Sequence, residues 1–216
     1  SGRSTYLENI MKLQFIAAAV IAASVLPAQA SLINSAGSLL NPTSVVDFEA
    51  YDGLITSGPE VVATGVTFNG DIDAELGAYI RDLGENGVWG VGNHCAAAGS
   101  NGQISFTFDT LQSGFGAWVN HFRDVGGQIT VSAYDSSSNL LESYSLALST
   151  DVYSYNDGAF MGIARHVADI RSVTFSGVGA VADNLTYTAA VPEPESYALA
   201  LAALGVLVGM TRRRAQ

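Results

Sequence analysis

Three acidic residues lie near the two ends of the central part of the chain, where they could supply oxygen ligands to a metal ion. Asp47 and Glu49 alternate with Val46 and Phe48 in a strand-like pattern, and Asp183 lies in a second such pattern 134 positions further on. Ca²⁺ takes six to eight oxygen ligands, including carboxylates and backbone carbonyls. If the fold brings its first and last strands together, these acids could hold a structural Ca²⁺. The alternative is that they only solvate strand edges.

A second acidic group, Asp71-x-Asp73-x-Glu75, has the spacing at which a calcium-binding loop begins. An EF-hand would need glycine at the sixth position and glutamate at the twelfth, but these positions hold Leu76 and Asp82. We therefore expect a solvated acidic loop, in which calcium binding would be weak.

The residues that could perform catalysis do not form a recognisable pattern. His94 and Cys95 are adjacent, but neighbouring positions do not place an imidazole against a sulfur, and the three histidines lack metal-ligand spacing. We predict a non-catalytic protein with no catalytic residues. Two alternatives stay open: a calcium-dependent carbohydrate-binding module, with Trp89, Trp118 and two tyrosines as a stacking platform, and a secreted hydrolase that uses a carboxylate pair.

The elements that must position these groups are strands, because the hydrophobic period is two. Apolar residues alternate with Ser, Thr and Gln over residues 103–108, 128–133 and 172–176, and turn signals such as Val125-Gly126-Gly127 separate these segments. The pattern predicts an all-β fold, an antiparallel β-sandwich similar to a jelly roll. Residues 70–102 are the least regular part, and we expect long loops there.

Charge and composition exclude several classes of protein. The chain has 216 residues and a net charge of −11, and residues 31–190 hold 17 acidic residues against four arginines, a net charge of −13 without a lysine. Such a surface repels phosphate, so we expect no nucleic-acid partner. The single cysteine rules out a disulfide within the chain.

The N-terminal part predicts a cleaved signal peptide. Met11-Lys12 gives a positively charged start, residues 15–26 are apolar, and Ala28-Gln29-Ala30 has the small-x-small pattern that signal peptidase cleaves. Residues 1–30 are therefore expected to be an upstream extension followed by a signal helix, with cleavage after Ala30 and a mature domain over residues 31–190.

The C-terminal 26 residues, like the N-terminal segment, consist of three parts in a characteristic order. Pro192-Glu193-Pro194 is a rigid, extended element, residues 197–210 carry no charge, and Arg212, Arg213 and Arg214 follow. This order resembles the PEP-CTERM sorting signal of Gram-negative bacteria. The resemblance implies a sorting signal over residues 191–216 that includes a short hydrophobic transmembrane helix, export across the inner membrane, transient anchoring there, and processing by an exosortase. The alternative is a permanent type I anchor.

The body also resembles the β-sandwiches that precede such signals, in Val45-Val-Asp-Phe-Glu49 and Val181-Ala-Asp-Asn-Leu-Thr-Tyr187. The Asp-Phe-Glu and Asp-Asn elements are also similar to those of MAM-type sandwiches, a resemblance that implies a structural Ca²⁺ held by acids of the first and last strands. Together with the sorting signal, we expect a structural or adhesive protein of the cell surface or of the extracellular matrix of a biofilm. Its expected partners are signal peptidase, exosortase, the inner membrane transiently, and an exopolysaccharide.

Overall fold

The described part of the computed structural model is built almost wholly of antiparallel strands. The structure describes residues 30–39, 44–79, 92–122, 126–149 and 158–189. The early elements are β1 (Ala30–Ile33), a 3-10 turn η1 (Ala36–Ser38), β2 (Ser44–Val46), β3 (Leu54–Ile55), β4 (Glu60–Ala63), β5 (Val66–Gly70), β6 (Glu75–Tyr79) and β7 (His94–Ala97). The later strands are β8 (Gln103–His121), β9 (Gly126–Tyr134), β10 (Leu140–Ser149), β11 (Ala159–Arg165), β12 (Ile170–Ser176) and β13 (Ala180–Ala189).

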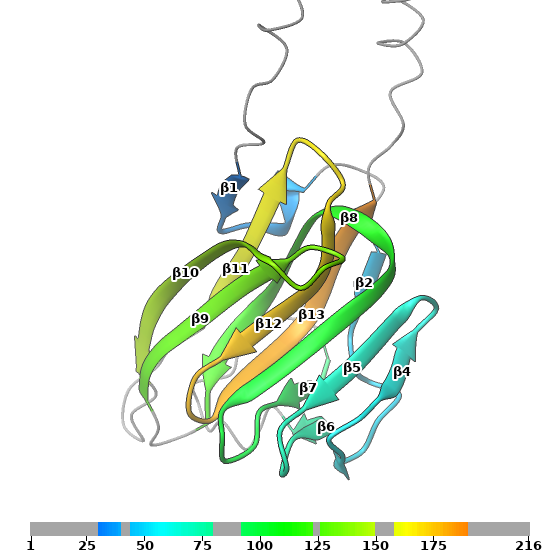
Figure 1. Ribbon diagram of the computed structural model, residues 1–216. Helices are drawn as coiled ribbons and strands as arrows, with labels where there is room; N and C mark the ends of the chain where they lie inside the picture. The colour runs from blue at the N-terminus through cyan, green and yellow to red at the C-terminus, as the bar shows by residue number, and fades with distance from the viewer. Residues whose placement is uncertain (1–29, 40–43, 80–91, 123–125, 150–157, 190–216) are drawn as a thin grey trace, which may run out of the picture.

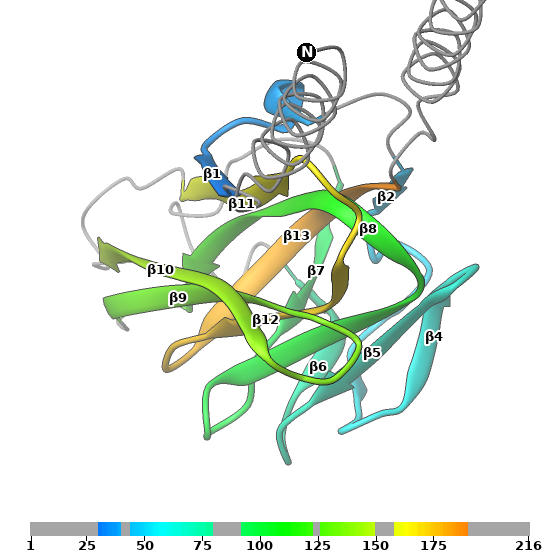
Figure 2. The ribbon, with the colours of Figure 1, turned by 45° about the horizontal axis from the view of Figure 1, so that its top comes forward.

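These strands form two layers that share β8 (Figures 1 and 2). The front layer has the order β10-β9-β12-β8-β5-β4 and uses the first part of β8. The back layer has the order β1-β11-β8-β13-β7-β6-β3 and uses the second part of β8, with β2 added to β13. The predicted all-β antiparallel sandwich is confirmed.

The long strand β8 passes from one layer to the other between these two parts. Residues 103–107 pair with β12, and residues 114–119 pair with β11. At Gly116 a Cβ atom would lie 2.4 Å from the ring of Phe160, so only glycine lets β8 approach β11 this closely. Two separate strand patterns in the sequence are therefore one continuous strand.

Phenylalanine side chains from both layers fill the space between them. Phe106 is fully buried, and its ring centroid lies 5.7 Å from that of Phe48, 5.7 Å from that of Phe68 and 6.3 Å from that of Phe175. These four rings come from β8, from the segment after β2, from β5 and from β12. The core therefore joins segments from most of the chain length.

The expectation of long loops over residues 70–102 is wrong in two places. Strands β6 and β7 lie there and pair with each other, and Leu76 and Ala96 are buried in the core. Alanine-rich strands lack the β-branched residues from which a strand is usually inferred.

The predicted terminal elements lie outside the described residues. This is so for the signal segment before Ala30 and for residues 190–216. Within the ranges described above, no helix is long and apolar enough to cross a membrane.

We expect Phe106→Ala to destabilise residues 31–190 by about 3–5 kcal/mol, because it leaves a cavity among three aromatic rings. Urea unfolding followed by circular dichroism measures the change. The matched control is Thr107→Ala, the next residue of the same strand, whose side chain faces outward and whose loss should cost less than about 1 kcal/mol. Equal losses for the two variants would contradict the assigned inward face of β8.

Candidate functional site

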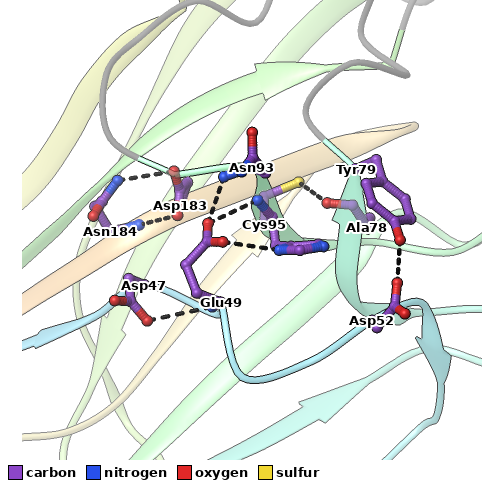
Figure 3. Close-up of polar contacts among 10 residues, drawn as sticks. Asp47, Glu49, Asp52, Ala78, Tyr79, Asn93, Cys95, Asp183 and Asn184 are labelled. Atoms are coloured by element: carbon purple, nitrogen blue, oxygen red, sulfur yellow. Dashed lines mark hydrogen bonds and ion pairs between the residues drawn. The ribbon is translucent and has the colours of Figure 1, made fainter.

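The pairing of β2 with β13 brings together the acidic residues at the two ends of the body. Val46 lies opposite Leu185 in this antiparallel ladder, so the segment after β2 lies beside Asp183 and Asn184 (Figure 3). The backbone thus places the segment that holds Asp47 and Glu49 next to the strand that holds Asp183. The strand that pairs with the last strand, β13, is thus the second strand of the described chain and not the first. The first strand, β1, pairs with β11.

Asp47 and Glu49 are not part of a regular strand, which corrects the strand pattern inferred for them. β2 ends at Val46, and Phe48 has a φ of 59° in the left-handed region. Phe48 is buried, and its ring packs on Phe106, so the chain turns sharply to insert this side chain in the core. Asp47 Oδ1 accepts the backbone N–H of Glu49 at 3.3 Å, which closes the turn.

Glu49 binds the chain where β7 begins. Its Oε1 accepts the backbone N–H groups of Asn93 at 2.5 Å and of His94 at 2.9 Å, and its Oε2 lies 2.9 Å from Nδ1 of His94. Burial acts to raise the pKa of Glu49, but the hydrogen bonds from His94 and Asn93 and the charge of His94 outweigh it and hold the pKa below its ordinary value. The carboxylate therefore joins segments 45 positions apart.

Asp183 is completely buried in β13. Its oxygens accept the backbone N–H of Asn184 at 2.6 Å and the side-chain amide of Asn184 at 2.8 Å. Asn184 has a φ of 50°, a conformation that asparagine tolerates better than most residues, and the register with β8 shifts between Asp183 and Thr186. The irregular backbone turns the carboxylate toward its own neighbour.

Tyr79, His94 and Cys95 adjoin this cluster. The Tyr79 ring lies 4.8 Å from the His94 ring, and its hydroxyl donates to Asp52. The Cys95 thiol is buried and donates to the carbonyl of Ala78 at 3.4 Å, and His94 Nε2 is buried without a hydrogen-bond partner among the described residues. The Glu49–His94 contact could not be predicted from the sequence, since no local pattern links positions 45 residues apart.

The oxygen-rich donor set of Asp47, Asp183 and Asn184 suits a hard cation such as Ca²⁺. Both oxygens of Glu49, however, already accept hydrogen bonds from residues 93 and 94, and both oxygens of Asp183 accept from Asn184. Among the described residues, no three His, Cys, Asp or Glu side chains are placed to hold one metal ion. A Ca²⁺ here would need backbone carbonyls to complete its ligands, and calcium stays a prediction.

The other predicted residues are distributed as follows. Asp71 Oδ1 accepts the backbone N–H of Gly99 at 2.5 Å, and Asp73 Oδ2 accepts the hydroxyl of Ser100 at 2.7 Å, so these acids bind the loop before β8. Trp118 packs edge-on against Phe160, with ring centroids 6.0 Å apart. Ala30, the predicted cleavage residue, begins β1. The described ranges do not include Ala28, Asp82, Trp89, Pro192, Glu193, Pro194, Arg212, Arg213 or Arg214.

We expect Glu49→Gln to lower the free energy of unfolding by roughly 1 kcal/mol near neutral pH, because a partly exposed charged acceptor is lost. The low pKa of Glu49 makes this contribution fully present above the unfolded-state value of 4.5, and it disappears as the pH falls through the lower folded-state value. Wild type and variant should therefore converge in acid, as thermal melts at several pH values would show. Glu60→Gln on β4 is the control, and a constant difference at every pH would contradict the assignment.

No curated protein matches the chain. Among solved structures, the K2 cleaved adhesin domain of Lys-gingipain is 14% identical, with 68% of this chain and 98% of that chain covered and a TM-score of 0.40. A DUF4465 family protein from Bacteroides caccae is 9% identical, with 77% and 96% covered and a TM-score of 0.38. A family 6 carbohydrate-binding module is 15% identical, with 68% and 94% covered and a TM-score of 0.32. Likenesses of this size do not define a function.

The C-terminal part of the chain gives a more specific match. Residues 190–215 match the family model of the PEP-CTERM protein-sorting motif. The match includes the Pro-Glu-Pro element, the uncharged segment and the arginine cluster on which the sequence resemblance rests. The chain therefore carries the PEP-CTERM protein-sorting motif, which implies export, processing by exosortase and a place at the cell surface or outside the cell.

Proposed function

We propose that the sandwich domain is a non-catalytic structural or adhesive component of the cell surface or extracellular matrix of a Gram-negative bacterium. The observation that carries this proposal is the position of the sorting motif. The motif begins at residue 190, directly after Ala189, the last residue of β13. Processing near the Pro-Glu-Pro element would release the sandwich with its last strand intact.

Several charged side chains of the domain form hydrogen bonds or ion pairs within the domain itself, which supports a structural role. The guanidinium of Arg165 binds both oxygens of Asp169, at 2.6 and 2.8 Å, and reaches Glu142 on β10 at 3.5 Å. Asp135 accepts from the backbone N–H groups of Ser137 and Asn139, each at 2.8 Å, in the turn between β9 and β10. Like Glu49, these groups close turns and link separate strands, here β11 of the back layer and β10 of the front layer.

The proposed path to the surface requires the Pro-Glu-Pro element, because the motif is what the exosortase is expected to read. We expect that replacing Pro192, Glu193 and Pro194 together by alanine leaves the tail attached and the protein in the membrane fraction of its native host. Intact-mass spectrometry of exported wild-type protein should show a chain that begins at Ser31 and lacks Arg212–Arg214.

The matched control is Glu195→Ala, which changes a neighbouring charge and keeps the Pro-Glu-Pro element. Exported wild-type protein that still carries its arginine cluster would contradict processing and leave a permanent anchor. For the adhesive role, cells that lack the protein should aggregate less and recover with the wild-type gene. Unchanged aggregation would contradict that role without affecting the sorting result.

A structural Ca²⁺ between the ends of β2 and β13 is a further part of this proposal. The 17 acidic residues of the body have only four arginines as partners, so a cation is a physically reasonable counter-charge. Asp47 and Asp183 come from the two segments that the ion would link. Glu49 and Asp183, whose oxygens all accept hydrogen bonds, would each have to give up or share one of these bonds to bind the ion.

We expect Ca²⁺ at a hundredfold excess over its Kd to stabilise the fold by about 2.7 kcal/mol and to raise its melting temperature by several degrees. Thermal melts in EDTA, Ca²⁺ and Mg²⁺ would measure this for wild type, Asp47→Asn, Glu49→Gln and Asp183→Asn. Comparison of each variant with and without the ion separates binding from the cost of the substitution itself. A calcium shift that survives all three changes would place the ion elsewhere, and an equal shift with Mg²⁺ would indicate general screening.

A further inference from the structure

The outward side chains of the front layer form continuous rows across five strands, which lie side by side in Figure 1. We name these residues the hydroxyl face. Its first row is Ser143, Ser132, Thr174, Ser105 and Asn69. Its second row is Tyr134, Ser172, Thr107 and Thr67, and its third is Ser145, Thr130, Ser176 and Gln103.

Every residue of the hydroxyl face is uncharged, although the body carries a net charge of −13. All of them except Ser132, which is buried, keep contact with solvent. Neighbouring strands in a sheet lie about 4.8 Å apart, so the face repeats polar groups at that interval. The central strands of the front layer therefore present uncharged polar side chains outward, bordered by the exposed apolar residues Leu140, opposite Tyr134, and Val61, opposite Thr67, and by Asp109 in β8.

Contacts between strands hold several of these groups in place. Thr130 Oγ1 lies 2.7 Å from Ser145 Oγ, and Ser132 Oγ lies 2.9 Å from Ser143 Oγ. Ser105 donates its hydroxyl to the carbonyl of Asn69 at 3.2 Å. A hydroxyl can donate one hydrogen bond and accept two, so each retains capacity for a ligand. Fixed polar groups bind with less loss of side-chain entropy.

The first and third rows end at a pocket of about 300 Å³, at the small end of the range for ligand pockets. Its lining residues are Asn69, Gly70, Asp71, Asn101, Gln103 and Ser105. Asp71 Oδ2 is buried and has no hydrogen-bond partner among the described residues, while Oδ1 accepts from Gly99. Burial of an unpaired acceptor is costly, and a rotation of this side chain toward the pocket would let Oδ2 accept a hydrogen bond from a ligand.

We propose that the hydroxyl face and its pocket bind an uncharged polysaccharide. Hydroxyl, amide and single carboxylate groups match the donors and acceptors of sugar hydroxyls, and the pocket would take one sugar residue while the rows contact the chain. Tyr134, at the opposite side of the face from the pocket, offers a ring on which a sugar can pack. An acidic polymer would be repelled by Asp71 and by the charge of the body.

This inference rests on the proposed adhesive role and names its ligand class. Pre-formed rows on a flat sheet face suit a long chain that makes many weak contacts. The three rows become adjacent only through the register of β9, β12, β8 and β5, and a shift of one residue in any of these strands would turn apolar side chains outward.

The test is affinity electrophoresis of the full chain, purified in mild detergent, through gels that contain dextran, galactomannan, mixed-linkage β-glucan or, as the acidic probe, alginate. We expect at least one neutral polymer to retard the wild type and alginate to have no effect. Asp71→Asn should weaken binding about tenfold, because a charged acceptor is lost while its shape is kept. Thr174→Glu, which places a charge at the centre of the first row, should abolish retardation.

Thr174→Val removes one hydroxyl and keeps the branched shape, so it tests the face if Thr174→Glu does not fold. It should weaken binding several-fold. The matched control is Val45→Glu, on the exposed strand β2 of the back layer, which adds the same charge away from the face and should leave retardation unchanged. Melting temperatures would confirm that each variant is folded.

The proposal is overturned if no neutral polymer retards the wild type, or if alginate retards it more strongly than the neutral polymers do. It is also overturned if Val45→Glu reduces retardation as much as Thr174→Glu. It is also overturned if Asp71→Asn and Thr174→Val both bind like wild type. Because the assay uses purified protein, it is independent of sorting. A protein that is exported and promotes aggregation but binds no neutral polymer would refute this inference alone, and a purified protein that binds but is not exported would refute only the proposed function.

Discussion

A single 19-residue strand, β8, belongs to both layers of the sandwich, and the rest of the structure depends on how it crosses between them. Its first part carries Phe106 into the core and pairs with β12 and β5. Its second part pairs with β11 and β13. Glycine at position 116 allows the close approach to Phe160 that the second layer needs. Because β8 pairs with strands of both layers, this one strand fixes the position of each layer relative to the other.

The back layer closes around β13, the strand from which the sorting motif follows. β13 pairs with β8 on one side and with β2 and β7 on the other. Glu49, just after β2, binds the start of β7 through backbone N–H groups and the His94 ring. One carboxylate therefore ties together two strands that both pair with β13, so the part of the domain nearest the motif is held by several contacts.

The turns and the hydroxyl face differ in the chemistry of the residues they carry. Acidic side chains gather at turns and strand ends of both layers, where they accept hydrogen bonds from backbone N–H groups. The rows of the hydroxyl face carry hydroxyl and amide groups instead. A protein of this charge stays soluble and avoids acidic polymers. The neutral face is then the surface on which uncharged partners meet the fewest fixed charges.

The sequence by itself determined the class of fold and the sorting motif. Strict alternation at residues 103–108 and 172–176 predicts strands with one apolar and one polar side, and both are confirmed. The motif was readable because its order of proline, apolar and basic elements is local. Alternation also gave the polar residues of the hydroxyl face, because a period of two assigns every second side chain to the outside.

Only the tertiary structure decided which strands are neighbours and in which register. Nothing near Glu49 in the sequence points to His94, and the left-handed turn at Phe48 interrupts the alternation from which a strand was inferred. β6 and β7 were missed because alanine and glycine give no strand signal. The rows through Thr174 and the pocket beside Asp71 arise from pairing between segments as far apart as Gln103 and Ser176, and pairing over such distances depends on packing of the whole core.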